Sequence, residues 1–118
     1  MLNFFKNRRT RKDLLQNWRI PFEASYRLID NGDSIQYVNE DESRILYFSM
    51  LMLTDSQVFS GDAMTKMQPS LTKSEDGWQL KGAKRGGKEV LICVFTFTNE
   101  NDEAQMKNLF ENIEYIDS

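Results

Sequence analysis

Two segments of this chain are apolar on both faces of an extended strand, and this feature constrains the fold more than any other. In residues 44–54 both alternating sets of side chains are largely apolar, and residues 88–98 repeat the pattern. A strand with two apolar faces lies in the middle of a sheet that is covered on both sides. We therefore expect two central strands with helices packed against both faces of their sheet.

Weaker patterns around these segments predict the remaining elements. Alternation of polar and apolar residues predicts strands over 22–29, 34–38 and 78–85. Helical spacing predicts a short helix ending at Trp18, another within 55–75 and a C-terminal helix after Asn99. The apolar stripe of the last helix comprises Met106, Leu109, Phe110, Ile113 and Ile116.

The expected order of elements is α-β-β-β-α-β-β-α, which predicts the α+β class. We expect an antiparallel sheet of about five strands with helices on both faces, that is, a three-layer α/β/α sandwich. The chain of 118 residues has the length of one domain. Residues 1–118 are therefore interpreted as a single domain, with a basic helical segment over 1–18 and the sandwich body over 19–118.

The composition excludes much catalytic chemistry. The chain has no His, so it has no imidazole base, no Ser-His-Asp arrangement and no zinc site that uses His. The single Cys, Cys93, lies in an apolar strand and is expected to be a buried, inert thiol. Residues 82–88 are rich in Gly and Lys but lack the spacing of a phosphate-binding loop, and Gly86-Gly87 is interpreted as a hairpin turn. We expect no cofactor and no enzyme activity, with a hydrolase that uses carboxylates alone as the alternative.

Charge and hydropathy bear on partners and location. The net charge of −3 does not indicate a nucleic-acid-binding protein. The longest apolar-rich run has about nine residues, whereas a membrane-spanning helix needs about 20, so no stable membrane insertion is expected. The apolar stretch at residues 1–5 is too short for a signal peptide, and the sequence predicts a cytoplasmic protein.

An acidic segment is the candidate contact surface. Its carboxylates lie in two polar connections on either side of one short predicted strand, and a tyrosine lies between them; the residues are Asp30, Asp33, Tyr37, Glu40, Asp41 and Glu42. Carboxylates at both ends of one strand, with an aromatic anchor, would suit a basic protein partner. The competing interpretation is a hydrated acidic rim without a binding role.

Several segments together resemble the PsbP-like α/β/α sandwich family, which includes Ran-binding Mog proteins and bacterial DcrB-like domains. They are the Trp-Arg-Ile-Pro-Phe run at 18–22, the Asp-Asn-Gly-Asp-Ser turn at 30–34, the strand at 44–49, Gly77-Trp78, the hairpin that runs on to Phe97 and the helix end at Asn112-Ile113. The resemblance implies a scaffold without catalytic motifs.

Small, acidic, His-free domains of this kind are also similar to bacterial immunity proteins. Those proteins neutralise a cognate toxin that is delivered by type VI or contact-dependent secretion. The similarity implies a non-catalytic module, monomeric or weakly dimeric, whose partner is a toxin domain or a secreted effector. The alternative within this class is a secretion chaperone similar to the Eag adaptors, which hold apolar segments of effectors.

Overall fold

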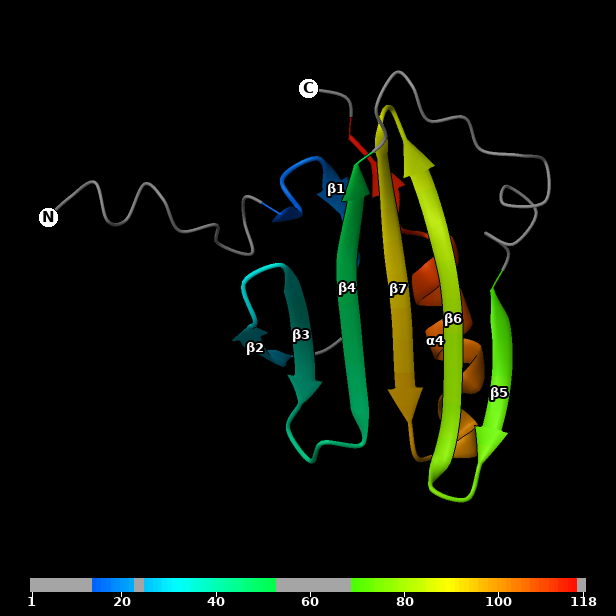
Figure 1. Ribbon diagram of the computed structural model, residues 1–118. Helices are drawn as coiled ribbons and strands as arrows, with labels where there is room; N and C mark the ends of the chain where they lie inside the picture. The colour runs from blue at the N-terminus through cyan, green and yellow to red at the C-terminus, as the bar shows by residue number, and fades with distance from the viewer. Residues whose placement is uncertain (1–13, 23–24, 53–68, 117–118) are drawn as a thin grey trace, which may run out of the picture.

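The computed structural model describes residues 14–22, 25–52 and 69–116, and its main element is an antiparallel sheet of six strands. The strands are β2 (Tyr26–Asp30), β3 (Ser34–Asn39), β4 (Arg44–Met52), β5 (Ser70–Ser74), β6 (Gly77–Gly86) and β7 (Glu89–Phe97). Their order across the sheet is β2-β3-β4-β7-β6-β5, so two three-stranded meanders meet at the β4–β7 pair (Figure 1). This confirms that the two doubly apolar segments form the central strands.

Smaller elements lie behind this sheet in Figure 1. Strand β1 (Trp18–Arg19) pairs with β8 (Glu114–Tyr115) in a separate two-stranded sheet. After β7 the chain forms the 3₁₀ turn η1 (Glu100–Asp102) and then helix α4 (Glu103–Glu111). Asn99 caps η1, because its side chain accepts a hydrogen bond from the backbone N–H of Asn101. Helix α4 packs against β6 and β7.

The predicted three-layer α/β/α sandwich is wrong. Strands make up 56% of the described residues, and within them one short helix covers one face of the large sheet while no helix covers the other. The apolar alternation of β4 and β7 was interpreted as two covered faces. On the second face, however, Ile45, Tyr47 and Ile92 are only half-buried, and no described helix lies over them.

Other boundaries also differ from the prediction. The helix expected to end at Trp18 does not reach it, because Trp18 begins β1 and pairs with Tyr115. The helix expected within 55–75 falls mostly outside the described residues, but Ser70–Ser74 is the edge strand β5. The stripe of the last helix is buried as far as Ile113, whereas Ile116 is exposed because the chain leaves α4 at Glu111 and enters β8.

The hydrophobic core lies between the large sheet and α4. Its fully buried side chains come from alternate positions of the central strands and from the apolar stripe of the helix, and include Leu46, Phe48, Leu91, Phe95, Phe97, Met106 and Leu109. Two glycines of β6 allow α4 and β8 to pack closely against this strand. A Cβ on Gly82 would lie 2.6 Å from the ring of Phe110, and one on Gly86 would lie 2.1 Å from the ring of Tyr115. These positions therefore need glycine for close packing.

The β6–β7 hairpin turn is Gly87-Lys88, one residue later than the predicted Gly86-Gly87 turn. Gly87 has a φ of 57°, and among the described non-glycine residues only Glu42 has a positive φ. A two-residue loop with positive φ at its first position alone is a type II′ turn, which favours glycine there. Gly86 is instead the last residue of β6, where it pairs with Glu89.

Four hydrogen bonds join the helical side to the sheet. Arg44 donates to Asp102 at 2.9 Å and to Gln105 at 2.8 Å, and the hydrogen bond with Asp102 raises the pKa of Arg44. Lys84 Nζ donates to the carbonyl oxygens of Glu111 and Ile113, both at 3.0 Å, and so satisfies the C-terminal end of α4. Desolvation lowers the pKa of Lys84.

Candidate functional site: the open face of the sheet

The face of the large sheet opposite α4 carries a continuous apolar stripe. Strand register assigns side chains to faces, because residues paired across strands point to the same side. Phe48 pairs with Cys93 and faces the core, so the neighbouring positions of β4 and β7 face away from α4. The apolar side chains on this open face are Ile29, Val38, Ile45, Tyr47, Leu51, Val90, Ile92 and Val94.

These side chains lie outside the main core cluster, but most of them are not exposed. Val38 and Val90 are buried, each 4% exposed, and Ile45, Tyr47 and Ile92 are half-buried. Leu51 is 42% exposed. No described helix or strand packs on this face (Figure 1). A half-buried apolar stripe that no described element covers is a candidate protein interaction site.

The charged side chains that point to this face are all basic. Arg27 lies on β2 at one border of the stripe, and Lys81 and Arg85 lie on β6 at the other. Within the described strands, the alternation of side chains between the two faces places Asp30 and Glu89 on the α4 side. A partner for this face therefore needs an apolar centre and an acidic border opposite β6, which is the complementary arrangement.

The face is wide enough for an interface. Six strands about 4.8 Å apart span about 24 Å, and seven residues of β4 span about 20 Å. The projected area is therefore about 500 Å², which is the larger part of the roughly 800 Å² that each partner contributes to a standard interface. One cavity, of about 200 Å³, lies on this face toward β5, where its lining includes Gln79 and Thr96. A face of this area suits a protein partner.

The acidic residues predicted as a contact surface fall into two separate turns. Asp30 and Asp33 lie at the start of β3, and its other end leads into Glu40, Asp41 and Glu42. Each group has local structural contacts. Asp30 accepts a hydrogen bond from the backbone N–H of Gly32 at 2.9 Å, which supports the β2–β3 turn.

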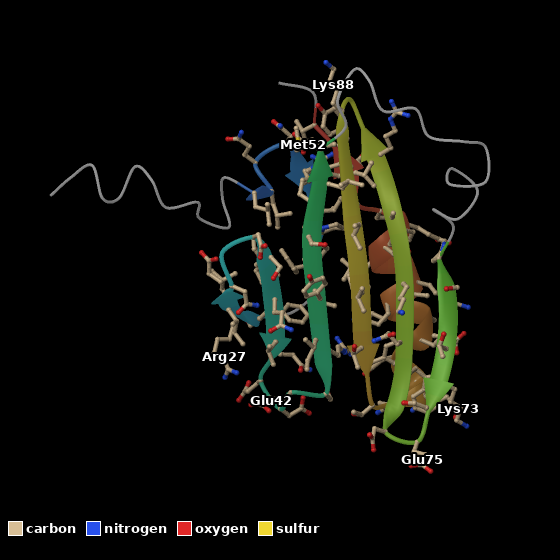
Figure 2. The ribbon with its side chains drawn as sticks, in the orientation of Figure 1. Arg27, Glu42, Met52, Lys73, Glu75 and Lys88 are labelled. Atoms are coloured by element: carbon tan, nitrogen blue, oxygen red, sulfur yellow. The ribbon has the colours of Figure 1, made fainter. Side chains whose placement is uncertain are left out.

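The second turn is held in the same way. Asp41 accepts hydrogen bonds from the side chain of Ser43 at 2.7 Å and from its backbone N–H at 3.1 Å, and these bonds lower the pKa of Asp41. Glu42 lies 3.7 Å from Arg27, and Figure 2 shows the two side chains at the same end of the sheet. The acidic turn thus borders the open face.

Tyr37 is not a solvent-facing aromatic anchor. It lies on the α4 side of β3, where it is half-buried and packs against the core. Its ring lies 4.5 Å from that of Phe22 and 6.0 Å from that of Phe48. Tyr47, which the sequence pattern placed on an apolar strand face, is the tyrosine that faces away from the core. Whether the acidic segment binds a partner stays a prediction.

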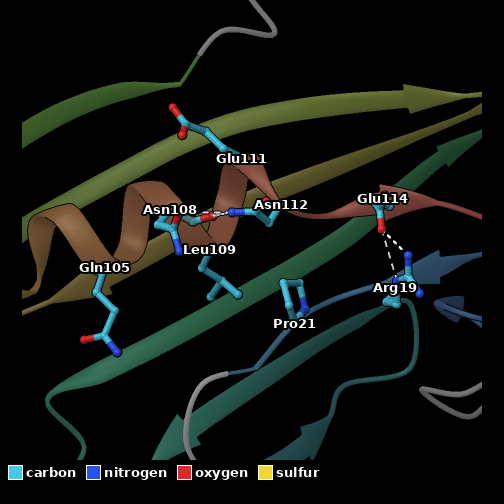
Figure 3. A pocket seen from close by; sticks show the side chains of 8 residues that line it. All are labelled: Arg19, Pro21, Gln105, Asn108, Leu109, Glu111, Asn112 and Glu114. Atoms are coloured by element: carbon cyan, nitrogen blue, oxygen red, sulfur yellow. Dashed lines mark hydrogen bonds and ion pairs between the residues drawn. The ribbon is translucent and has the colours of Figure 1, made fainter.

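The cavities carry little reactive chemistry. One of about 480 Å³ lies between α4 and β1, where Arg19 pairs with Glu114 and the side chains of Asn108 and Asn112 are hydrogen-bonded (Figure 3). Its other lining residues are Pro21, Gln105, Leu109 and Glu111. A polar cavity with paired charges offers no activated nucleophile.

The described residues also contain no cluster of three or more His, Cys, Asp or Glu side chains placed to hold a metal ion. Cys93 is 1% exposed, and burial raises the pKa of its thiol to about 12, as expected for an inert cysteine. The carboxylates of the two acidic turns lie at opposite ends of β3 and do not converge on one of the cavities above.

Comparisons with protein families, with curated proteins and with solved structures find no match to this chain. The resemblance to the PsbP-like family and the similarity to immunity proteins therefore stay predictions from the sequence. In the part of the chain that the structure describes, no helix is long and apolar enough to cross a membrane.

Proposed function

We propose that this chain is a non-catalytic protein-binding domain that contacts its partner through the open face of the six-stranded sheet. The observation that carries the proposal is the apolar stripe centred on Tyr47 and Ile92, which lies outside the core and is bordered by Arg27, Lys81 and Arg85. Apolar centres with polar borders are the usual anatomy of protein interfaces. Lys81 and Arg85 make the β6 border positive, whereas Arg27 at the other border lies 3.7 Å from Glu42. The β6 side of the face therefore complements an acidic partner better than a second copy of itself.

The more specific function that we propose is that of a cytoplasmic immunity protein, which binds a cognate toxin domain and blocks it. A face of this size suits a folded toxin surface. An adaptor similar to the Eag chaperones is the second candidate, because the same apolar stripe would also hold an apolar effector segment.

Co-expression tests this proposal. The protein encoded by the neighbouring gene is expressed alone and together with this chain, and bacterial growth is measured. An immunity protein restores growth, whereas an adaptor raises the soluble yield of its effector without relieving toxicity. Ile92→Asp should abolish either effect, while Lys107→Ala, on the exposed side of α4, should not. Full activity of the Ile92→Asp variant, with its fold intact by circular dichroism, would overturn the assignment of the open face.

A further inference from the structure

Strand β6 extends beyond its neighbour β5. The pairing of the two strands begins at Ser70 opposite Lys81 and ends at Ser74 opposite Gly77. Strand β6 continues to Gly86 while it pairs with β7 on its other side. If the β5–β6 pairing is continued by one residue, Pro69 lies opposite Gly82, and Pro69 has no backbone N–H to donate. Among the described residues, no strand lies beside the outer edge of residues 83–86.

Two hairpins independently show which backbone groups point outward along this edge. In an antiparallel pair, hydrogen-bonded positions alternate, and the residues that flank a two-residue turn form a hydrogen-bonded pair. The Gly87-Lys88 turn therefore directs the backbone groups of Gly86, Lys84 and Gly82 toward β7. The turn between β5 and β6 directs those of Gly77, Gln79 and Lys81 toward β5.

The two hairpins agree on the direction of the backbone N–H and C=O groups at the remaining positions of β6. Ala83 and Arg85 direct their N–H and C=O groups outward, beyond the end of β5. Together they present two donors and two acceptors in the spacing of a strand. Such a row of backbone groups is a template for pairing with another strand.

A cavity of about 560 Å³ runs along this same edge on the α4 side. Its lining includes Trp18, Phe110, Ile113 and Tyr115 beside residues 83–85. A strand added to β6 would point the side chain opposite Lys84 into this cavity, because paired residues share a face. Lys84 itself is held by the α4 carbonyls, so the aromatic walls favour an apolar side chain there.

The opposite side of the same edge favours a carboxylate. Arg85 points to the open face and is exposed, and its Nε donates to the carbonyl oxygen of Gly87 at 3.3 Å. The guanidinium carries four further N–H donors, from which a carboxylate can accept hydrogen bonds. Glu111 also lines the cavity, but on the α4 side. A side chain opposite Arg85 therefore lies across the sheet from Glu111. Opposite charges in such cross-strand pairs stabilise strand pairing.

We propose that residues 83–86 of β6 bind an extended peptide strand by β-strand addition, with an acidic side chain opposite Arg85 and an apolar side chain in the adjoining cavity. The outward backbone groups of Ala83 and Arg85 supply up to four hydrogen bonds, and the cavity and the guanidinium supply selectivity. This site shares Arg85 with the border of the apolar stripe, but its backbone groups and its cavity lie at the edge of β6, so it does not depend on the function proposed above.

Amide hydrogen exchange, measured residue by residue by NMR on the full chain, tests the proposal. In the free protein, the amides of Ala83 and Arg85 should exchange at least about 100-fold faster than that of Lys84, which faces β7. The probe is the peptide acetyl-Thr-Val-Glu-Val-Thr-amide, whose antiparallel register places Glu opposite Arg85 and the second Val opposite Lys84. At saturation the probe should slow exchange at Ala83 and Arg85 by at least about tenfold.

The matched control is the same peptide with N-methyl groups on Glu and on the final Thr, which removes the two donors that strand pairing needs. The variant Arg85→Gln should weaken binding of the acidic probe about three- to tenfold, with the exchange of Lys84 unchanged. Slow exchange at Ala83 and Arg85 in the free protein would overturn the proposal, because the edge would already be paired. Absence of protection by the probe, or equal protection by the methylated peptide, would overturn it as well.

Discussion

Adjacent residues of β7 should differ sharply in what they contribute to stability. Leu91 faces α4 and is 0% exposed, whereas Ile92 faces the open side and is half-buried. Truncation to Ala removes three carbon atoms at either position. The pair therefore compares the two faces of one central strand at matched side-chain size.

The expected losses follow from the surroundings. Leu91→Ala leaves a cavity beneath α4, and such substitutions cost about 2–5 kcal/mol. Ile92→Ala removes partly solvated area and some strand propensity, which together cost about 1 kcal/mol. Urea unfolding followed by the fluorescence of Trp18 and Trp78 measures both. With a slope of about 1.5 kcal/mol per M urea, the first variant should unfold about 2 M earlier than wild type and the second less than about 1 M earlier.

Equal losses at the two positions would refute this reasoning. They would show that the face opposite α4 is buried as deeply as the core, as the three-layer sandwich requires. The comparison is valid only if the slope of the unfolding transition is the same in both variants, because a changed slope indicates a changed unfolded or folded state.

Four further outcomes follow from the packing and the charges. Gly86→Ala should lower the free energy of unfolding by about 1–3 kcal/mol, because its Cβ would overlap the ring of Tyr115, and an unchanged melting temperature would contradict this contact. Cys93 should not react with a thiol reagent at pH 8 until the protein unfolds, and rapid native-state labelling would contradict its burial. Because the pKa of Cys93 is raised from 9.0 to about 12, its contribution to stability is complete below pH 9 and is lost as the pH rises toward 12, so wild type should lose more stability over this range than Cys93→Val. Asp102→Ala should cost about 3 kcal/mol in chemical unfolding, since it leaves the largely buried Arg44 without its ion pair, and a loss below about 1 kcal/mol would contradict that role.

The central strands were predictable because residues 44–52 and 89–97 are apolar at nearly every position, and few other elements tolerate that pattern. The sequence could not show that, among the described residues, the second face of the sheet carries no helix. Alternation alone does not distinguish a face covered by a helix from one left half-buried. Ile92 and Leu91 are equally apolar in the sequence, and only the position of α4 separates them. Strand β5 is polar and fully exposed, so its extended form depends on its pairing with β6.

The candidate site was predictable only in its apolar part. Tyr47 and Ile92 belong to strands whose two faces were recognised. The border charges come from two distant points of the chain, Arg27 from β2 and Lys81 and Arg85 from β6, and the strand register alone brings them to one face. The acidic turns were predicted as a contact surface because their charged residues are close together in the sequence. Their carboxylates support the turns in which they lie, a role that requires the three-dimensional hydrogen bonds to recognise.

The affinity for an inactivated partner toxin, measured by titration calorimetry for two variants, tests the central claim most directly. Tyr47→Ser removes an aromatic group from the middle of the open face, while the triple reversal of Asp33, Asp41 and Glu42 to Lys changes the acidic turns and leaves the stripe intact. We predict that Tyr47→Ser weakens binding at least about 30-fold, a hot-spot loss of about 2 kcal/mol, and that the reversal changes affinity less than about threefold. The opposite ranking, with both variants folded, would contradict the open face as the binding surface and assign binding to the acidic turns.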